Sequence, residues 1–291
     1  MIWLTWRQFR VSAVVAAAAL LATAILLGIT HPSSGGFVSH DHLLKFLSTF
    51  LVGVPALIGA FWGAPLVAGE LESGTYRLAW TQSVTRERWL AVKFAMIALA
   101  AVTVTGLLSL MLTAWSSTAV NQGRFSGAMF AERGIAPMGY AVLGFALGVT
   151  AGILIRRTLP AMATTLVAFL ATRIVAQNWV RPHFAAPLKL SAVLSAENGD
   201  PVQAKPGAWV ISNHIVSATG HTINNISCGA RSPANGVTGD VQSCMAQYHA
   251  VLTYQPASRY WTFQSYETAI FAVGGLLLIA FSFWWIRRRV S

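Results

Sequence analysis

The stretch Ile135–Ile155 reads IAPMGYAVLGFALGVTAGILI and contains no Asp, Glu, Lys or Arg. A helix needs about 20 apolar residues to cross the hydrocarbon core of a bilayer, so this stretch predicts a transmembrane helix. Five more stretches on either side have the same character, and of all six only the fifth carries a charge, Arg173. The sequence therefore predicts an all-α polytopic membrane protein with six spans. The other five are Val11–Ile29, Phe46–Leu66, Phe94–Trp115, Leu159–Trp179 and Ala269–Ile286.

The composition agrees with a membrane protein. Of the 291 residues, 55% are hydrophobic and only 10% are charged, whereas soluble domains average roughly 45–50% and about 25%. The net charge of +11 could indicate a nucleic-acid partner, but so apolar and charge-poor a chain argues against one. Basic residues gathered on one membrane face explain the charge instead. An ordinary soluble enzyme and a disordered chain are disfavoured on the same grounds.

The basic residues also orient the spans. With the N-terminus in the cytoplasm, eleven of them face inside, and the two short outer loops hold three, Lys45, Arg124 and Arg133. Cytoplasmic loops carry the excess of Lys and Arg, so we expect a multi-pass membrane protein with both termini in the cytoplasm. The 16 Arg against 4 Lys, with abundant Ala, are typical of a high-GC bacterium, so we expect a bacterial cell membrane. The inner residues are Arg7, Arg10, Arg77, Arg86, Arg88, Lys93, Arg156, Arg157, Arg287, Arg288 and Arg289.

The first ten residues, MIWLTWRQFR, are amphipathic, with Trp3 and Trp6 close to Arg7 and Arg10. Trp rings favour the headgroup level of a bilayer and arginines favour anionic lipid. These residues predict an N-terminal interfacial helix on the inner leaflet, in contact with membrane lipid. The alternative is a simple extension of the first span.

Residues 180–264 differ in composition from the rest, since they are rich in Asn, Ser, Gly, Pro and His and contain no run of spanning length. We predict a small extracytoplasmic domain or loop here, between helices five and six. It separates residues 1–179 from the last helix and the basic cytoplasmic tail, 265–291. Within it, 208–212 and 248–254 have the pattern of strands or short helices.

Both cysteines of the chain, Cys228 and Cys244, lie in this segment. A disulfide persists on the outer side of a bacterial membrane, so we expect the two to be bonded. Two free thiols are the alternative. A metal held by two cysteines alone is a weak interpretation.

Glycines recur every four residues in two spans, at Gly59 and Gly63 and at Gly144, Gly148 and Gly152. Small residues at this spacing let helix backbones approach closely in lipid. The pattern predicts close helix packing, either within one subunit or at a subunit interface.

Motifs of catalysis and cofactor binding are missing. The phosphate-binding pattern GxxxxGK[ST] is absent because no lysine follows a glycine, and HExxH, CxxC and GxSxG are also absent. We expect no catalytic, cofactor-binding or metal-binding residue in this chain. His40-Asp41-His42 could begin a metal site, but a solvated loop explains the triplet.

The loop from Gly69 to Lys93, GELESGTYRLAWTQSVTRERWLAVK, is the most informative segment. Gly74 is a natural helix end because glycine accepts the left-handed conformation. Thr75 can cap a short helix from Tyr76 to about Trp80, and Thr85 can cap the next long helix. The pattern predicts a helix, a tight break, a short amphipathic helix and a re-entering helix, which a soluble partner can bind.

This segment carries a resemblance to a known family. The run Glu70-Leu71-Glu72-Ser73-Gly74-Thr75, followed by Val84-Thr85-Arg86 and Lys93, resembles type-2 ABC transporter permeases of the exporter type. The opening MIWLTWRQFR and the stretch AFWGAPLVAGELESGT are similar to permeases of high-GC Gram-positive bacteria. The resemblance covers residues 1–179 and 269–291, and the long 180–264 segment departs from it.

The resemblance implies a permease subunit that forms half of a translocation path. A separate ABC ATPase subunit would bind ATP-Mg, and a second permease subunit, identical or different, would complete the path. The short helix would be the coupling helix. Its expected contacts with the ATPase are polar at Glu70, Glu72 and Arg77 and apolar at Tyr76, Leu78 and Trp80, around the turn at Gly74 and Thr75. Alternatively, Glu70 and Glu72 only end the span and pair with Arg86 or Arg88.

Two other function classes stay open. The first is a membrane sensor or immunity protein that binds an extracellular ligand through 180–264 without transport. The second is a membrane enzyme, which the missing catalytic motifs disfavour.

Arg173 is the charge inside a span, and it lies about 9 Å below the outer end of its helix at Trp179, at 1.5 Å per residue. The acid at similar depth is Glu267, at the start of the sixth span. We predict an intramembrane Arg173–Glu267 pair. The alternative is that the arginine snorkels to lipid headgroups.

Overall fold

A computed structural model describes residues 2–29, 41–73, 86–116, 124–125, 127–194, 203–223, 228 and 244–289 of the chain. The chain divides into two compact units. The helical unit comprises Met1–Val120, Gly127–Phe184 and Trp261–Ser291, and the sheet unit comprises Asn121–Ser126 and Ala185–Tyr260.

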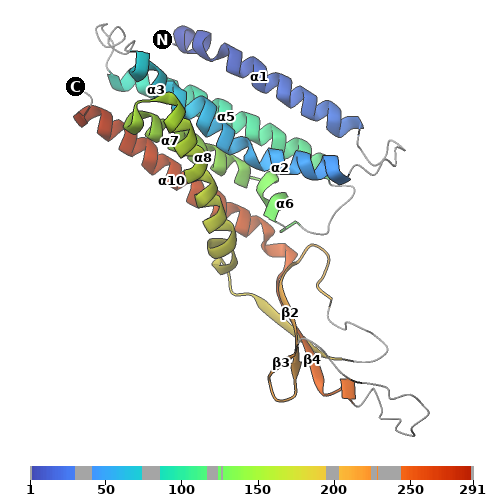
Figure 1. Cartoon of the computed structure of the whole chain (residues 1–291). Coiled ribbons are helices and arrows are strands. Elements are labelled where there is room, and N and C mark those ends of the chain that lie inside the picture. The colour runs from blue at the N-terminus through green and yellow to red at the C-terminus, as the bar shows by residue number, and fades with distance from the viewer. Residues whose placement is uncertain are drawn as a thin grey trace. The chain divides into compact units, whose positions relative to one another are not determined.

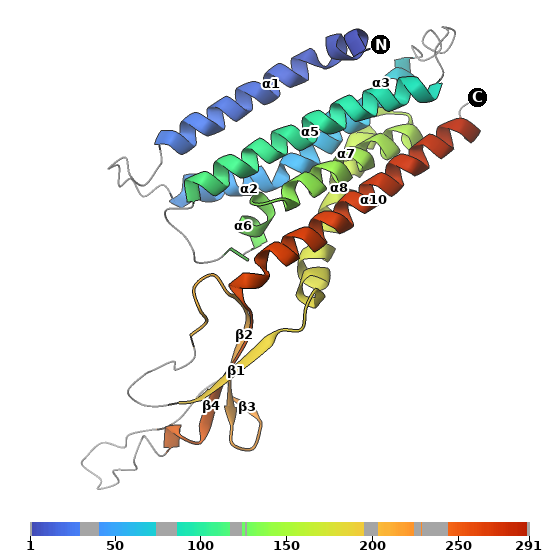
Figure 2. The same cartoon turned by 180° about the vertical axis from the view of Figure 1, so that it is seen from behind.

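The described residues of the helical unit form six helices that are long and apolar enough to cross a membrane, as the sequence predicted. They alternate in direction, so that α1 begins and α10 ends at one end of this unit, where α3 also ends (Figures 1 and 2). The six are α1 (Ile2–Ile29); α2 (Asp41–Ile58) with η2 (Gly59–Gly63) and α3 (Ala64–Ser73); α5 (Arg86–Ser116); α7 (Ala136–Ile155); α8 (Thr158–Val175) with η3 (Ala176–Val180) and η4 (Arg181–His183); and α10 (Tyr260–Arg289). A short helix not expected from the sequence, α6 (Gly127–Glu132), precedes α7.

Two local expectations need correction. Helix α1 runs without a break from Ile2 to Ile29, which matches the alternative of an extended first span and gives no separate interfacial helix. Helix α2 begins at Asp41, so Asp41 and His42 are helical and do not belong to a loop. His40 lies outside the described residues.

Helix α7 is the centre of the helical unit. Within its span 72% of the residues are buried, against 6% in the span of α1, and α7 packs against α2, α3, α5 and α8. Apolar side chains fill the surrounding core, among them Phe94 and Ile97 of α5 and Phe145 and Val149 of α7. Gln264 links α10 to the start of α7, because its side-chain oxygen accepts a hydrogen bond from the Ala136 backbone N–H at 2.8 Å.

The glycines explain how closely α7 approaches the second span. A Cβ on Gly148 would lie 2.0 Å from the Gly59 carbonyl oxygen, and one on Gly63 would lie 2.6 Å from the Phe145 carbonyl oxygen. Neither distance leaves room for a side chain, so only glycine fits. The glycine pattern therefore marks packing within one chain, the first of the two interpretations offered by the sequence.

The sheet unit corrects the all-α prediction. Its described residues form a four-stranded sheet in the order β1-β4-β2-β3, made of β1 (Leu188–Val193), β2 (Trp209–Ser217), β3 (Thr222–Ile223) and β4 (Tyr248–Gln255). All paired strands are antiparallel. The stretches 208–212 and 248–254, predicted as strands or short helices, belong to β2 and β4. Both stretches are strands and not short helices, because β4 lies between β1 and β2 and pairs with both.

Candidate functional site

Two helix ends within the Gly69–Lys93 segment lie where the sequence predicted them. Helix α3 ends at Ser73, directly before Gly74, and α5 begins at Arg86, directly after Thr85. The turn and the predicted short helix lie outside the described residues. They include the predicted contact residues Gly74, Thr75, Tyr76, Arg77, Leu78 and Trp80.

Glu70 joins the two helices on either side of this segment. Lys93 Nζ of α5 donates to Glu70 Oε1 of α3, and the Lys93 side chain is only 2% exposed. A buried cation is costly unless it is paired, so Lys93 depends on this carboxylate. The pair fixes the end of α3 against the first turns of α5.

Glu72 makes a second tie, from α3 to α8. Its Oε2 accepts hydrogen bonds from the Thr158 backbone N–H at 3.0 Å and from Thr158 Oγ1 at 2.7 Å. Thr158 begins α8. A carboxylate at a helix N-terminus accepts a hydrogen bond from an otherwise unpaired backbone N–H, and its negative charge interacts favourably with the helix dipole. Both acids thus have partners inside the chain, as the alternative interpretation proposed. Among the described side chains, these partners are Lys93 for Glu70 and Thr158 for Glu72.

A charged cluster lies at the opposite end of the fifth and sixth spans. Arg173 Nη1 lies 3.1 Å from Glu267 Oε1, so the structure brings the predicted pair together. Arg181 bonds the same carboxylate at two points, from Nε to Oε2 at 2.7 Å and from Nη2 to Oε1 at 2.8 Å. The Tyr140 hydroxyl of α7 also donates to Oε1. Glu267 therefore joins α7, α8, η4 and α10 at one point.

A wide turn brings both arginines to Glu267. Residues eight apart on a regular α-helix differ by about 80° in direction at 100° per residue, so Arg173 and Arg181 would face different neighbours. The π-helix η3 lies between them, and its i→i+5 turn lowers the rotation per residue. The two guanidinium groups consequently converge on one carboxylate.

Aromatic faces complete the cluster. The Arg173 guanidinium lies 3.9 Å from the centre of the Tyr140 ring, and that of Arg181 lies 4.0 Å from the centre of the Phe130 ring. A cation over an aromatic face gains electrostatic stabilisation that grows as water is excluded. Such stabilisation helps the cluster to hold two positive charges against one negative charge.

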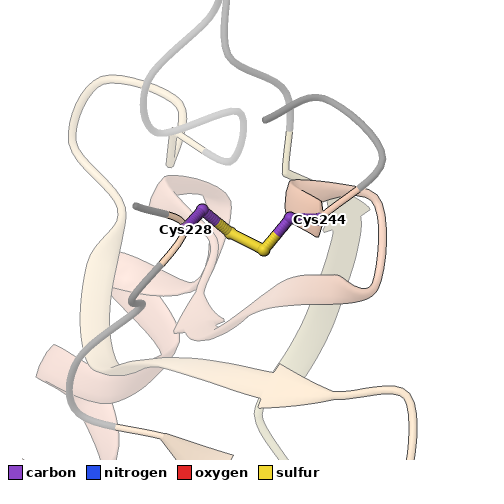
Figure 3. Close-up of a disulfide and its surroundings, with 2 residues drawn as sticks. All are labelled: Cys228 and Cys244. Carbon is purple, nitrogen blue, oxygen red and sulfur yellow. A yellow bond between two sulfur atoms is a disulfide. The ribbon is translucent and has the colours of Figure 1, made fainter. Parts of the chain in front are cut away.

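The sheet unit contains the predicted disulfide. Cys228 and Cys244 are bonded, with their Cα atoms 6.0 Å apart (Figure 3). Cys244 lies close before β4, whose residues Ala250 and Leu252 form the small apolar core of this unit with Leu194. The bond therefore links Cys228 to the short segment directly before β4, an inner strand of the sheet.

Sequence reasoning missed four partners, Lys93, Thr158, Tyr140 and Arg181. The sequence contained a signal for Lys93, because it is one of only four lysines in the chain and it ends the segment that begins beside Glu70. Arg181 was assigned to the long segment after the span, because the apolar run ends at Trp179. Among the described residues, no group of three or more His, Cys, Asp or Glu could hold a metal ion.

Comparison with protein families matches residues 1–181 to the family described as ABC-2 membrane transporter related. Searches of curated proteins and of solved structures found no match. The matched region is more than half of the chain and contains the first four spans, nearly all of the fifth and the Gly69–Lys93 segment. With six apolar helices, it indicates a multi-pass membrane component of an ABC transporter. The chain belongs to the ABC-2 membrane transporter related family.

Proposed function

We propose that the chain is the permease subunit of an ABC exporter and that a separate ABC ATPase drives it by binding and hydrolysing ATP-Mg. The observation that carries the proposal is the family match over residues 1–181, which spans the segment expected to bind the ATPase. The excess of basic residues on one side supports cytoplasmic termini and a cytoplasmic 74–85 segment. By the same argument, 180–264 lies outside the cell.

The ties at Glu70 and Glu72 support a coupling role for the segment. A ligand shifts a conformational equilibrium only through contacts that differ between the states, so a push on the segment must reach the spans through firm joints. Glu70 joins α3 to α5 through Lys93, and Glu72 joins α3 to α8 through Thr158. A displacement at residues 74–80 would therefore move three spans together.

The two acids take different roles in this proposal. Glu70 is a positioning residue, because one carboxylate oxygen bonds Lys93 and the other is buried. Glu72 is exposed and can still meet a partner. Direct contact with the ATPase is proposed for Glu72, Arg77, Tyr76, Leu78 and Trp80. A second permease subunit, identical or different, would complete the translocation path.

A Gly→Val pair of variants tests the coupling role. In Gly74→Val, a β-branched residue must occupy a helix-end position that favours left-handed backbone, which would misplace the short helix. Gly53→Val is the matched control, because a Cβ at Gly53 meets nothing within 4 Å. Both variants should insert into the membrane, and only Gly74→Val should lose ATP hydrolysis by the purified complex. Unchanged hydrolysis in Gly74→Val would contradict the coupling role.

The sheet unit favours one alternative, a sensor or immunity protein that binds an extracellular ligand through 180–264 without transport. A disulfide-linked sheet is a suitable scaffold for ligand-binding loops. Such a protein would need no ATPase. Isolation of the chain from its native membrane without any ABC ATPase would favour this alternative.

A further inference from the structure

Two adjoining pockets lie between α1, the second span and α5. The larger, called here the apolar pocket, has a volume of about 410 Å³, and its lining is apolar apart from Ser12 and Thr23. The Thr23 hydroxyl bonds the Ala19 carbonyl within α1. The smaller, called the inner pocket, has about 230 Å³ and extends to Gly69 and Glu70. Ser12, Phe61 and Trp62 line both pockets, so the two pockets adjoin each other.

A wide helical turn shapes the junction of the two pockets. Phe61 and Trp62 lie in the π-helix η2, and single π-turns inside α-helices occur frequently at functional sites. Trp62 meets Phe9 of α1 edge to face, with ring centres 4.9 Å apart. Three aromatic residues, Phe9, Phe61 and Trp62, thus line the inner pocket.

The inner pocket has a negative end. Glu70 is the one charged residue among the described residues that line either pocket, and neither lining includes a Lys or Arg. Glu70 Oε1 bonds the buried Lys93. Glu70 Oε2 is buried and has no hydrogen-bond partner within the described part of the chain. A buried acceptor without a donor is costly, so this end of the pocket favours a ligand that supplies one.

We propose that the two pockets bind an alkylammonium amphiphile, with the ammonium group in the inner pocket and the alkyl chain in the apolar pocket. Aromatic faces attract ammonium groups, and a charge-assisted bond to a carboxylate adds to that attraction. The proposal rests on the proposed function, because it names the class of substrate that such a permease would carry. An anionic amphiphile would meet the Glu70 carboxylate and is disfavoured. A neutral lipid chain would fill the apolar pocket but would gain nothing from Glu70.

Photolabelling of the purified full chain in lipid nanodiscs tests this inference. The probe is a primary dodecylammonium with a benzophenone on its alkyl chain, and mass spectrometry maps the labelled residues. We expect labels on the apolar-pocket residues of α1, α2 and α5. Dodecylammonium should compete with the probe at least tenfold better than dodecanol or dodecyl sulfate. Equal competition by dodecanol would show a general lipid pocket and would overturn the proposal.

Variants separate the two ends of the site. Glu70→Gln and Trp62→Leu should each lower labelling roughly tenfold, the loss expected when a charge-assisted or cation–π contact is removed. Because Glu70→Gln also disturbs Lys93, a second pair of variants fills the apolar pocket without touching Glu70. Ala19→Phe, in the pocket lining, should block labelling, whereas Ala18→Phe, on an exposed position outside the lining, should not. Undiminished labelling of Ala19→Phe, or of both Glu70→Gln and Trp62→Leu, would contradict the site. No step needs the ATPase, so failure here is distinct from failure of the proposed function.

Discussion

Arg181 and Glu267 form a two-point ion pair in which both side chains are only 1% exposed. Two parallel N–H···O bonds between a guanidinium and a carboxylate fix geometry as well as energy. Arg173 reaches the same carboxylate by one bond of 3.1 Å. The link between the fifth and the sixth span thus depends first on Arg181 and second on Arg173.

Arg181→Leu should destabilise the chain more than Arg173→Leu. Arg181→Leu removes two charge-assisted hydrogen bonds to Glu267, whereas Arg173→Leu removes one, and each such bond contributes about 1.5–3 kcal/mol. Thermal melting of the purified variants, followed by size-exclusion chromatography, measures the difference. A larger loss for Arg173→Leu would contradict the geometry.

Glu267→Gln should be the most harmful single change in the cluster, because it leaves two arginines without their carboxylate. When both partners of one pair are replaced, the double variant should lose less stability than the sum of the two single variants. The recovery should be larger for Arg181→Leu with Glu267→Gln than for Arg173→Leu with Glu267→Gln, since the second double variant leaves the buried Arg181 unpaired. Double-mutant cycles from the same melting data give both coupling energies, and equal couplings would argue against this order.

The cluster shows how far sequence reasoning reaches. Arg173 and Glu267 could be paired because each is a rare charge at a similar depth in an apolar span. Arg181 could not be assigned, because its position depends on the π-turn at Ala176–Val180, which lets the fifth helix continue beyond its apolar run. Tyr140 gave no signal either, since a tyrosine in an apolar span is ordinary until its hydroxyl finds a buried carboxylate.

Gly148→Ala should destabilise the helical unit. The added Cβ would lie 2.0 Å from the Gly59 carbonyl oxygen, so two backbones must separate, and overpacking of this kind costs about 1–3 kcal/mol or more. Gly28→Ala is the control, because its Cβ meets nothing within 4 Å. Melting temperatures should fall for Gly148→Ala alone. Equal melting temperatures would show that α7 and the second span are not in such close contact.

Replacing Cys228 and Cys244 by serine should loosen the sheet unit. A disulfide that closes a loop of about 15 residues contributes roughly 3 kcal/mol in the chain-entropy model. Limited proteolysis should therefore cut the 185–260 region faster in the double-serine variant, and in the reduced parent chain, than in the oxidised chain. Alkylation before reduction tests the bond directly. Free thiols at Cys228 and Cys244 in fresh membranes would show that the disulfide is not formed.

The fold was predictable where a single physical rule dominates. Length and apolarity alone located the six spans, and the residues expected at helix ends located the break after Ser73 and the start at Arg86. The sheet was predicted only in part, because 208–212 and 248–254 fit strands or short helices equally well and the pairing partners of β4 are far apart in sequence. The ties from Glu70 to Lys93 and from Glu72 to Thr158 join elements whose proximity no local pattern indicates.

The orientation of the spans can be tested with single cysteines in a chain that lacks Cys228 and Cys244. Cysteines placed at Ser83 and Arg289 should be protected from an impermeant thiol reagent in intact cells, because both positions lie on the side with the excess of Lys and Arg. A cysteine at Gly236 should react. Labelling of position 83 from outside would reverse the proposed topology.

Co-purification tests the central claim most directly. The tagged chain, extracted from its native membrane in mild detergent, should bring down an ATPase with a phosphate-binding loop, identified by mass spectrometry. Trp80→Ala with Arg77→Glu, within the proposed contact segment, should lose that ATPase, whereas Leu159→Ala, at an exposed position on α8, should retain it. An ATPase retained by the Trp80 and Arg77 variant would contradict the contact segment. A chain that purifies from native membranes without any ABC ATPase would contradict the permease account itself.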